Sequence, residues 1–151
     1  MKASAIASIH AVVSIIIALI FLNAGVKKFI PKAPRATDNA ILLKAVTEDT
    51  YVSPASFQIT MKAMKQSGFM YFIGVFQIAA AVLIVYPRTR LLGLLVLLPI
   101  VANIFLLHVF MDNRTHENIE TGLLFGLTLL LTTFYYKKFS TLLAESNWFK
   151  S

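Results

Sequence analysis

Two long runs of apolar residues, joined by a short turn, dominate the pattern along the chain. No charged residue lies between Gln66 and Pro87, and none lies between Leu91 and Met111. At about 1.5 Å per residue, a helix of roughly twenty residues crosses a hydrocarbon core of about 30 Å. Neither run shows the polar stripe at helical spacing that marks a helix on the surface of a soluble protein. The pattern therefore predicts a membrane hairpin.

Two further apolar segments extend this hairpin to four spans. We expect spans at about residues 5–26, 69–86, 91–111 and 119–136. A cleaved secretory signal is the alternative for the first segment, but no clear small-x-small cleavage site precedes Lys27 and Lys28. The predicted fold class is all-α, a polytopic membrane protein whose four-transmembrane-helix bundle forms a single membrane domain over residues 1–151.

The only long connection, the loop 27–68, has the composition of short interfacial helices. Asp38 can cap a helix through residues 41–46, and Ser53-Pro54 is a good N-cap and first-turn pair for a second helix that Gly68 closes. We expect that second helix to be re-entrant or interfacial, with a solvated loop as the alternative. The tail 137–151 is predicted to be amphipathic and to lie on the membrane surface, with Trp148 among the head groups.

Composition narrows the possible functions. The chain has 58% apolar and 14% charged residues and a formal charge of +7. Its basic residues flank the apolar runs and form no patch with interleaved aromatics, so we expect membrane lipids as partners and no nucleic acid. There is no cysteine, which excludes an iron–sulfur cluster and thiol exchange carried by this chain itself.

Lysine and arginine placement predicts the orientation. Lys2, Arg88, Arg90, Lys137 and Lys138 fall on one side of a four-span arrangement, in short segments without acidic neighbours. By the positive-inside rule that side is cytoplasmic, so both termini are expected in the cytoplasm, in a bacterial inner membrane. The basic residues in the long loop argue the other way but count for less, because long loops cross largely regardless of charge.

Small residues within the runs predict close helix packing. Small side chains let helix backbones approach closely in lipid, and a proline inside a helix needs neighbours that satisfy the freed carbonyl. We expect helix contacts at Gly25, Gly74, Ala79, Ala80, Ala81 and Pro99.

Five polar residues from three spans converge toward the outer end of the bundle in this arrangement, with Gln77 near mid-depth. They are Asn23, Lys27, Gln77, Asn103 and His108. Polar groups in a membrane are costly unless they are paired or face a wet cavity, so we expect them to form a ligand or partner site. The alternative is that they only hydrogen-bond to one another and fasten the helices together. No catalytic residue is predicted.

Metal and haem sites are not expected. His108, Asp112, His116 and Glu120 follow one another at intervals of four, but the chain must reverse direction among them, so no single helix can present all four. A bis-histidine haem would need His10 and His108 at the same depth, and they lie at different depths.

Several motifs resemble those of the DoxX-like family. They are Asn23-Ala-Gly25-Val-Lys27, the stretch GFMYFIGVFQ from Gly68 to Gln77, the turn Pro87 to Arg90, and Val101-Ala-Asn103 through His108. That family is similar to the small membrane subunits of thiosulfate:quinone oxidoreductase. The resemblance implies a four-helix membrane fold, partner subunits and a possible quinone. The chain has Gln77 where many relatives have a glutamate, which makes catalysis by this chain alone unexpected.

Three functions follow in order of preference. The first is an accessory subunit of a multi-protein membrane complex linked to redox chemistry, with a quinone or lipid site at the outer end of the bundle. The second is a non-catalytic assembly factor or chaperone for membrane proteins. The third is a carrier of small solutes, disfavoured because four short spans without charges at mid-membrane make a poor alternating-access machine.

Overall fold

The computed structural model describes residues 2–30 and 53–137, and every regular element in them is helical. The helices are α1 (Lys2–Val26), α3 (Ala55–Gln66), α4 (Phe69–Val85), α5 (Arg90–Leu107), the short π-helix η1 (His108–Asp112) and α6 (Thr115–Thr133). The expected all-α class is confirmed for this part of the chain. The short helix expected at 41–46 and the tail from residue 138 onward lie outside the described residues.

The number of candidate membrane spans is two to three. Within the described ranges, Ala5–Val26 and Arg90–Asp112 are each long and apolar enough to cross a membrane. A third candidate arises only if α3 and α4 count as one span, because they meet the criterion together but are bent by 78° at the break between them. α6 is not among the candidates, and its first turns carry Glu117 and Glu120. A bundle of four spans is therefore not established by the structure.

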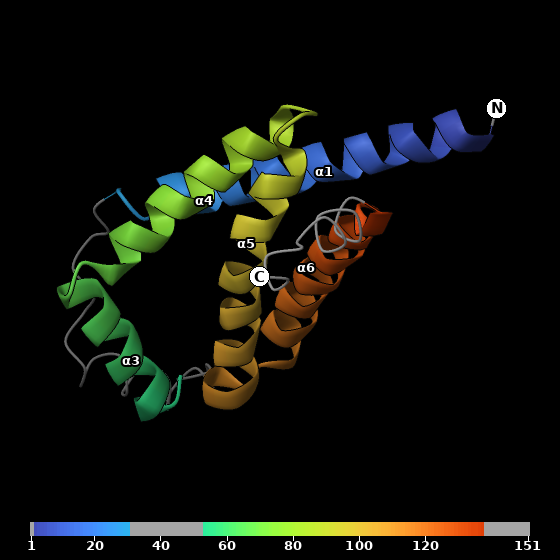
Figure 1. Cartoon of the computed structure of the whole chain (residues 1–151). Helices are drawn as coiled ribbons and strands as arrows, with labels where there is room; N and C mark the ends of the chain where they lie inside the picture. Colours follow the sequence, from blue (N-terminus) through green and yellow to red (C-terminus); the bar gives the residue numbers. More distant parts are fainter. Residues whose placement is uncertain (1, 31–52, 138–151) are drawn as a thin grey trace, which may run out of the picture.

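The helices form two antiparallel pairs. Figure 1 shows α1 and α4 side by side and running in opposite directions, while α5 and α6 form a second pair that lies across the first. α4 has the central place, because α1, α3 and α5 all pack against it. The amino-terminal end of α1 projects past the other helices (Figure 1).

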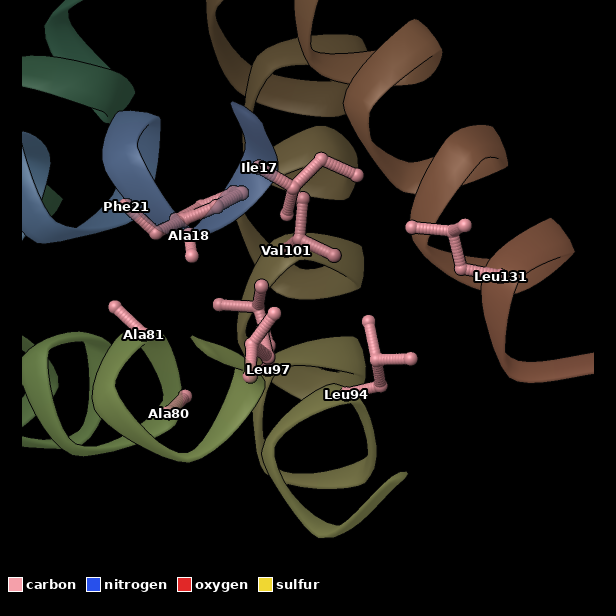
Figure 2. Packing of buried hydrophobic residues seen from close by; sticks show 10 residues of the cluster. Ile17, Ala18, Phe21, Ala80, Ala81, Leu94, Leu97, Val101 and Leu131 are labelled. Atoms are coloured by element: carbon pink, nitrogen blue, oxygen red, sulfur yellow. The ribbon is translucent and has the colours of Figure 1, made fainter. Parts of the chain in front are cut away.

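The apolar core lies where α1, α4, α5 and α6 converge, as Figure 2 shows. Its buried members are Ile17, Ala18 and Phe21 of α1, Ala80, Ala81 and Ile84 of α4, Leu94, Leu97 and Val101 of α5, and Leu131 of α6. On α1 and α4 these positions recur three or four residues apart, so each helix buries one stripe. Away from the core the helices expose large apolar side chains, for example Ile9 of α1, Leu92 of α5 and Leu123 of α6.

Glycines permit the closest backbone approaches. A Cβ added to Gly25 of α1 would lie 2.9 Å from the carbonyl oxygen of Gly74 of α4. On the next face of α4, a Cβ on Gly93 of α5 would lie 2.7 Å from the carbonyl oxygen of Ala80. Any larger residue at Gly25 or Gly93 would therefore have to push backbone away from backbone.

Two residues expected in these contacts lie elsewhere. Ala80 and Ala81 are buried, but Ala79 is exposed. Pro99 is also exposed, and α5 continues through it without a break. Ala79 is therefore not among the buried residues of α4, and Pro99 lies on the wall of a pocket between helices.

A buried polar contact joins α1 to α6. The Nε2 of His10 lies 3.2 Å from the carbonyl oxygen of Leu131, which can only accept, so Nε2 donates. The backbone N–H of Tyr135 donates to Thr132 at the helix end, which leaves the Leu131 carbonyl to be reached by the histidine. The ring of His10 also meets Phe134 and Tyr135 edge-on. His10 thus fastens the end of α6 to α1.

The close approach of α4 and α5 predicts how a methyl group added at Gly93 changes the stability of the protein. Gly93→Ala should lower the free energy of unfolding by about 1–3 kcal/mol, because the new Cβ would be forced into backbone atoms of α4. Gly126→Ala is the matched control, since a Cβ there meets nothing within 4 Å and alanine favours the helix. Unfolding in mild detergent should rank Gly126→Ala at or above the unchanged protein. Equal stability of the two variants would contradict the observed packing.

Candidate functional site

A pocket of about 510 Å³ lies between α3, α4 and α5. Its wall is mainly apolar and comes from three helices together with the carboxyl end of α1 and the π-helix. The lining residues are Lys28, Phe57, Met61, Met64, Phe69, Met70, Phe72, Ile73, Phe76, Val96, Pro99, Ile100, Asn103, Ile104, Leu107 and His108. A concave apolar site of this size with a few polar groups is typical of sites for small organic ligands.

The turn at Gly68 gives the pocket its third wall. Gly68 has φ +78°, a left-handed conformation that glycine adopts at little cost, and it separates α3 from α4. The resulting bend directs α3 back toward the end of α5, as Figure 1 shows. The prediction that Gly68 closes a helix is confirmed, although α3 begins at Ala55 with Pro54 in the N-cap position.

One face of α3 provides the apolar lid. Phe57, Met61 and Met64 follow one another at helical spacing, are half-buried and line the pocket. Methionine side chains are flexible and adapt to irregular ligands. The neighbouring Ile59 on the other face is 68% exposed and does not line the pocket.

Aromatic rings cover the α4 wall. Phe69 stacks on Phe72, and Phe72 lies 4.6 Å from Phe76 between ring centroids. Two other aromatic pairs do not line the pocket: Tyr71 packs on Phe29, and Phe105 stacks on Phe125. The aromatic lining therefore comes from one stripe of α4 together with Phe57 of α3.

The π-helix places a histidine beside a buried carboxylate. The N–H of Asn113 donates to the carbonyl of His108, five residues back, and closes the wide π-turn. The Nδ1 of His108 lies 3.3 Å from Oδ2 of Asp112, whose side chain is fully buried. The Nε of Arg114 donates to the same oxygen at 2.7 Å. The His108 ring meets Phe57 of the lid at 5.6 Å.

A second polar contact lies where α1 meets α4. The Lys28 ammonium donates to Oε1 of Gln77 at 2.7 Å and to the carbonyl of Ala24 at 3.3 Å. Gln77 is fully buried, and its amide nitrogen has no hydrogen-bond partner among the described residues. Gln77 therefore holds the lysine at the edge of the pocket through its oxygen alone.

The structure brings together only part of the expected site. Asn103 and His108 line the pocket, and Gln77 lies behind Lys28. Asn23 and Lys27 are exposed and do not line it. Asn23 falls between the buried positions Phe21 and Gly25 of α1, and Lys27 follows the end of that helix.

Lys28 was missed in favour of its neighbour, although the sequence holds the signal. It follows Gly25 by three residues, and residues three apart share a helix face. Since Gly25 packs on α4, the position three residues later points to the same side. Asp112 was considered only as one of four residues at intervals of four, and nothing in the sequence indicated the π-turn.

No metal cluster is evident in the described ranges, where no three His, Asp or Glu side chains gather. His116 and Glu120, also four residues apart, lie 3.9 Å from each other on the exposed surface of α6. The two histidine–acid pairs are therefore separate, as expected from the reversal of the chain between α5 and α6.

No protein-family model matches this chain, and no curated protein or solved structure is found to be similar to it. The resemblance to the DoxX-like family therefore remains a prediction, and the geometry of the pocket carries the functional argument.

The Lys28–Gln77 contact predicts a ranking of two variants. Gln77→Leu removes the acceptor from a buried ammonium contact and should lower the free energy of unfolding by about 1–2 kcal/mol. Gln77→Glu keeps an oxygen acceptor for the lysine and adds a charge of opposite sign, so it should lose less stability than Gln77→Leu. Thermal unfolding in mild detergent measures both. A leucine variant as stable as the glutamate variant would show that the contact contributes nothing.

Proposed function

We propose that this chain is an integral membrane protein of four spans that holds a quinone or another lipid-like molecule, and that it serves as an accessory subunit of a larger membrane complex. The observation that carries the proposal is the pocket between α3, α4 and α5. Its long apolar wall suits a hydrocarbon body, while Asn103 and His108 suit a polar head.

The distribution of exposed apolar side chains supports the membrane location. Ile16 and Leu19 of α1, Leu92 of α5 and Leu130 of α6 are large, apolar and exposed on three different helices. In water such a surface would aggregate, whereas in lipid it needs no further cover. In this proposal α4 crosses as the second span, with α3 as an interfacial segment, and α6 crosses as the fourth.

The free end of α1 supports the accessory role. The amino-terminal end of α1 projects past the other helices (Figure 1), and Ile6, Ile9 and Val12 in its first half are exposed. Such an apolar helix end offers a partner helix a contact area that the described residues leave uncovered. The resemblance to the DoxX-like family agrees with this role, because that family is similar to small membrane subunits of a redox enzyme.

The proposed orientation can be tested at two turns. The chain contains no cysteine, so Arg88→Cys and Asn113→Cys each introduce a single thiol at an exposed turn, one at each end of α5. With both termini in the cytoplasm of a bacterial cell, Asn113→Cys should react with an impermeant maleimide in intact cells. Arg88→Cys should react only after permeabilisation. The reverse pattern would invert the orientation, and labelling of both from outside would contradict the span of α5.

Filling the pocket should prevent ligand binding. Met64→Trp places a larger ring in the pocket wall and should weaken the binding of decylubiquinone by on the order of tenfold or more, about 1.4 kcal/mol. Ile59→Trp introduces the same ring on the exposed face of the same helix and is the matched control. Calorimetric titration of the purified protein in mild detergent measures both. Equal affinity in the two variants would place the ligand elsewhere.

A further inference from the structure

His108 differs from an ordinary buried histidine in what surrounds its two nitrogens. Its Nδ1 is buried and has Oδ2 of Asp112 at 3.3 Å, yet the contact is too bent to count as a hydrogen bond. The ring lines the pocket, its side chain is 16% exposed, and no partner for Nε2 occurs within the described residues. One nitrogen therefore faces a carboxylate, while the ring as a whole forms part of the pocket wall.

The carboxylate decides which nitrogen carries the proton. A lone pair on Nδ1 would face the negative oxygen of Asp112 and be repelled, whereas an N–H there is attracted even when the contact is bent. Arg114 donates to the same oxygen and reduces its charge, but a guanidinium has no acceptor to offer the ring. The proton of the neutral ring is therefore held on Nδ1, as a carboxylate beside a metal-bound histidine fixes the tautomer.

This tautomer sets the chemistry that the pocket recognises. With the proton on Nδ1, Nε2 of the neutral ring carries a lone pair and accepts a hydrogen bond. We infer that the pocket selects amphipathic molecules with a hydroxyl group, whose O–H donates to Nε2 of His108 while the apolar body lies along α3 and α4. This inference rests on the proposed function, because it requires that the pocket binds a ligand.

Two kinds of molecule carry the required hydroxyl. One is a phenol, the class that includes the reduced form of a quinone but not the oxidised form, which has only carbonyl acceptors. The other is an aliphatic alcohol such as a lipid with an unesterified hydroxyl. Asn103 cannot make this distinction, because its amide both donates and accepts. The aromatic stripe of Phe69, Phe72 and Phe76 gives a flat ring more contact than a single chain.

The tautomer itself can be observed on the unchanged protein. Nitrogen NMR of isotope-labelled histidine separates the two tautomers, and the chain has three histidines, so His108→Phe and His116→Gln assign the signals. We expect His108 as the Nδ1–H tautomer. His10, which donates through Nε2, should give the opposite signal when neutral and serves as an internal reference. A His108 signal of the Nε2–H form would overturn the inference.

Binding of matched probes tests the selection. Para-decylphenol should bind about tenfold more tightly than its methyl ether, which keeps an oxygen acceptor but has no donor. Cetyl alcohol and its methyl ether form the aliphatic arm, and the pair with the larger difference identifies the class. In His108→Phe, which keeps a ring against Phe57, the phenol should fall to the affinity of its ether. In His116→Gln, at the exposed pair, the tenfold difference should persist.

The outcomes separate the inference from the proposed function. If phenol and ether bind the unchanged protein equally well, and Met64→Trp weakens both, the pocket binds ligands but does not select a hydroxyl, and the inference is wrong. If none of the four probes binds, the proposed function fails together with the inference. If His108→Phe keeps the preference for the phenol, another residue recognises the hydroxyl and the inference is again wrong.

Discussion

The contact of α4 with its neighbours is the constraint on which the rest of the structure depends. Gly25 and Gly74 allow α1 and α4 to touch through their backbones, and Gly93 allows the same between α5 and α4. Because α1 comes so close, Lys28 reaches Gln77. α3 contacts both α4 and η1 and closes the third wall of the pocket. Bulkier residues at these positions would widen every one of these distances.

Much of the fold could be predicted from the pattern of apolar residues alone. Each charge-free run became a helix, and the helix ending at Gly68 followed from the conformational freedom of glycine. The number of spans was harder to predict than the helices themselves. α4 is only 17 residues long, and the acidic residues Glu117 and Glu120 lie in the first turns of α6. The exposure of Ala79 shows a similar limit, since small size says that a residue can pack closely but not which way it points.

The candidate site was predicted in part, and the errors have physical causes. Asn103 and His108 were found because polar residues are rare in apolar runs. Lys27 was predicted because it directly follows the apolar run. Lys28 is the residue that shares a helix face with Gly25, and the prediction did not take helix faces into account. The π-turn escaped prediction, since one hydrogen bond to a residue five positions back leaves no pattern in the residue types.

Burial explains why two similar sequence patterns have different chemical roles. His108–Asp112 and His116–Glu120 share the same spacing, and in both a ring nitrogen faces a carboxylate oxygen within 4 Å. The second pair is exposed at 88% and 63%, so water screens the charge and solvates either tautomer equally. In the pair His108–Asp112 the carboxylate is buried and water cannot reach it. The charge of Asp112 therefore acts on the His108 ring with little screening. The π-turn creates this difference, because it keeps Asp112 inside the bundle at the point where the chain leaves α5.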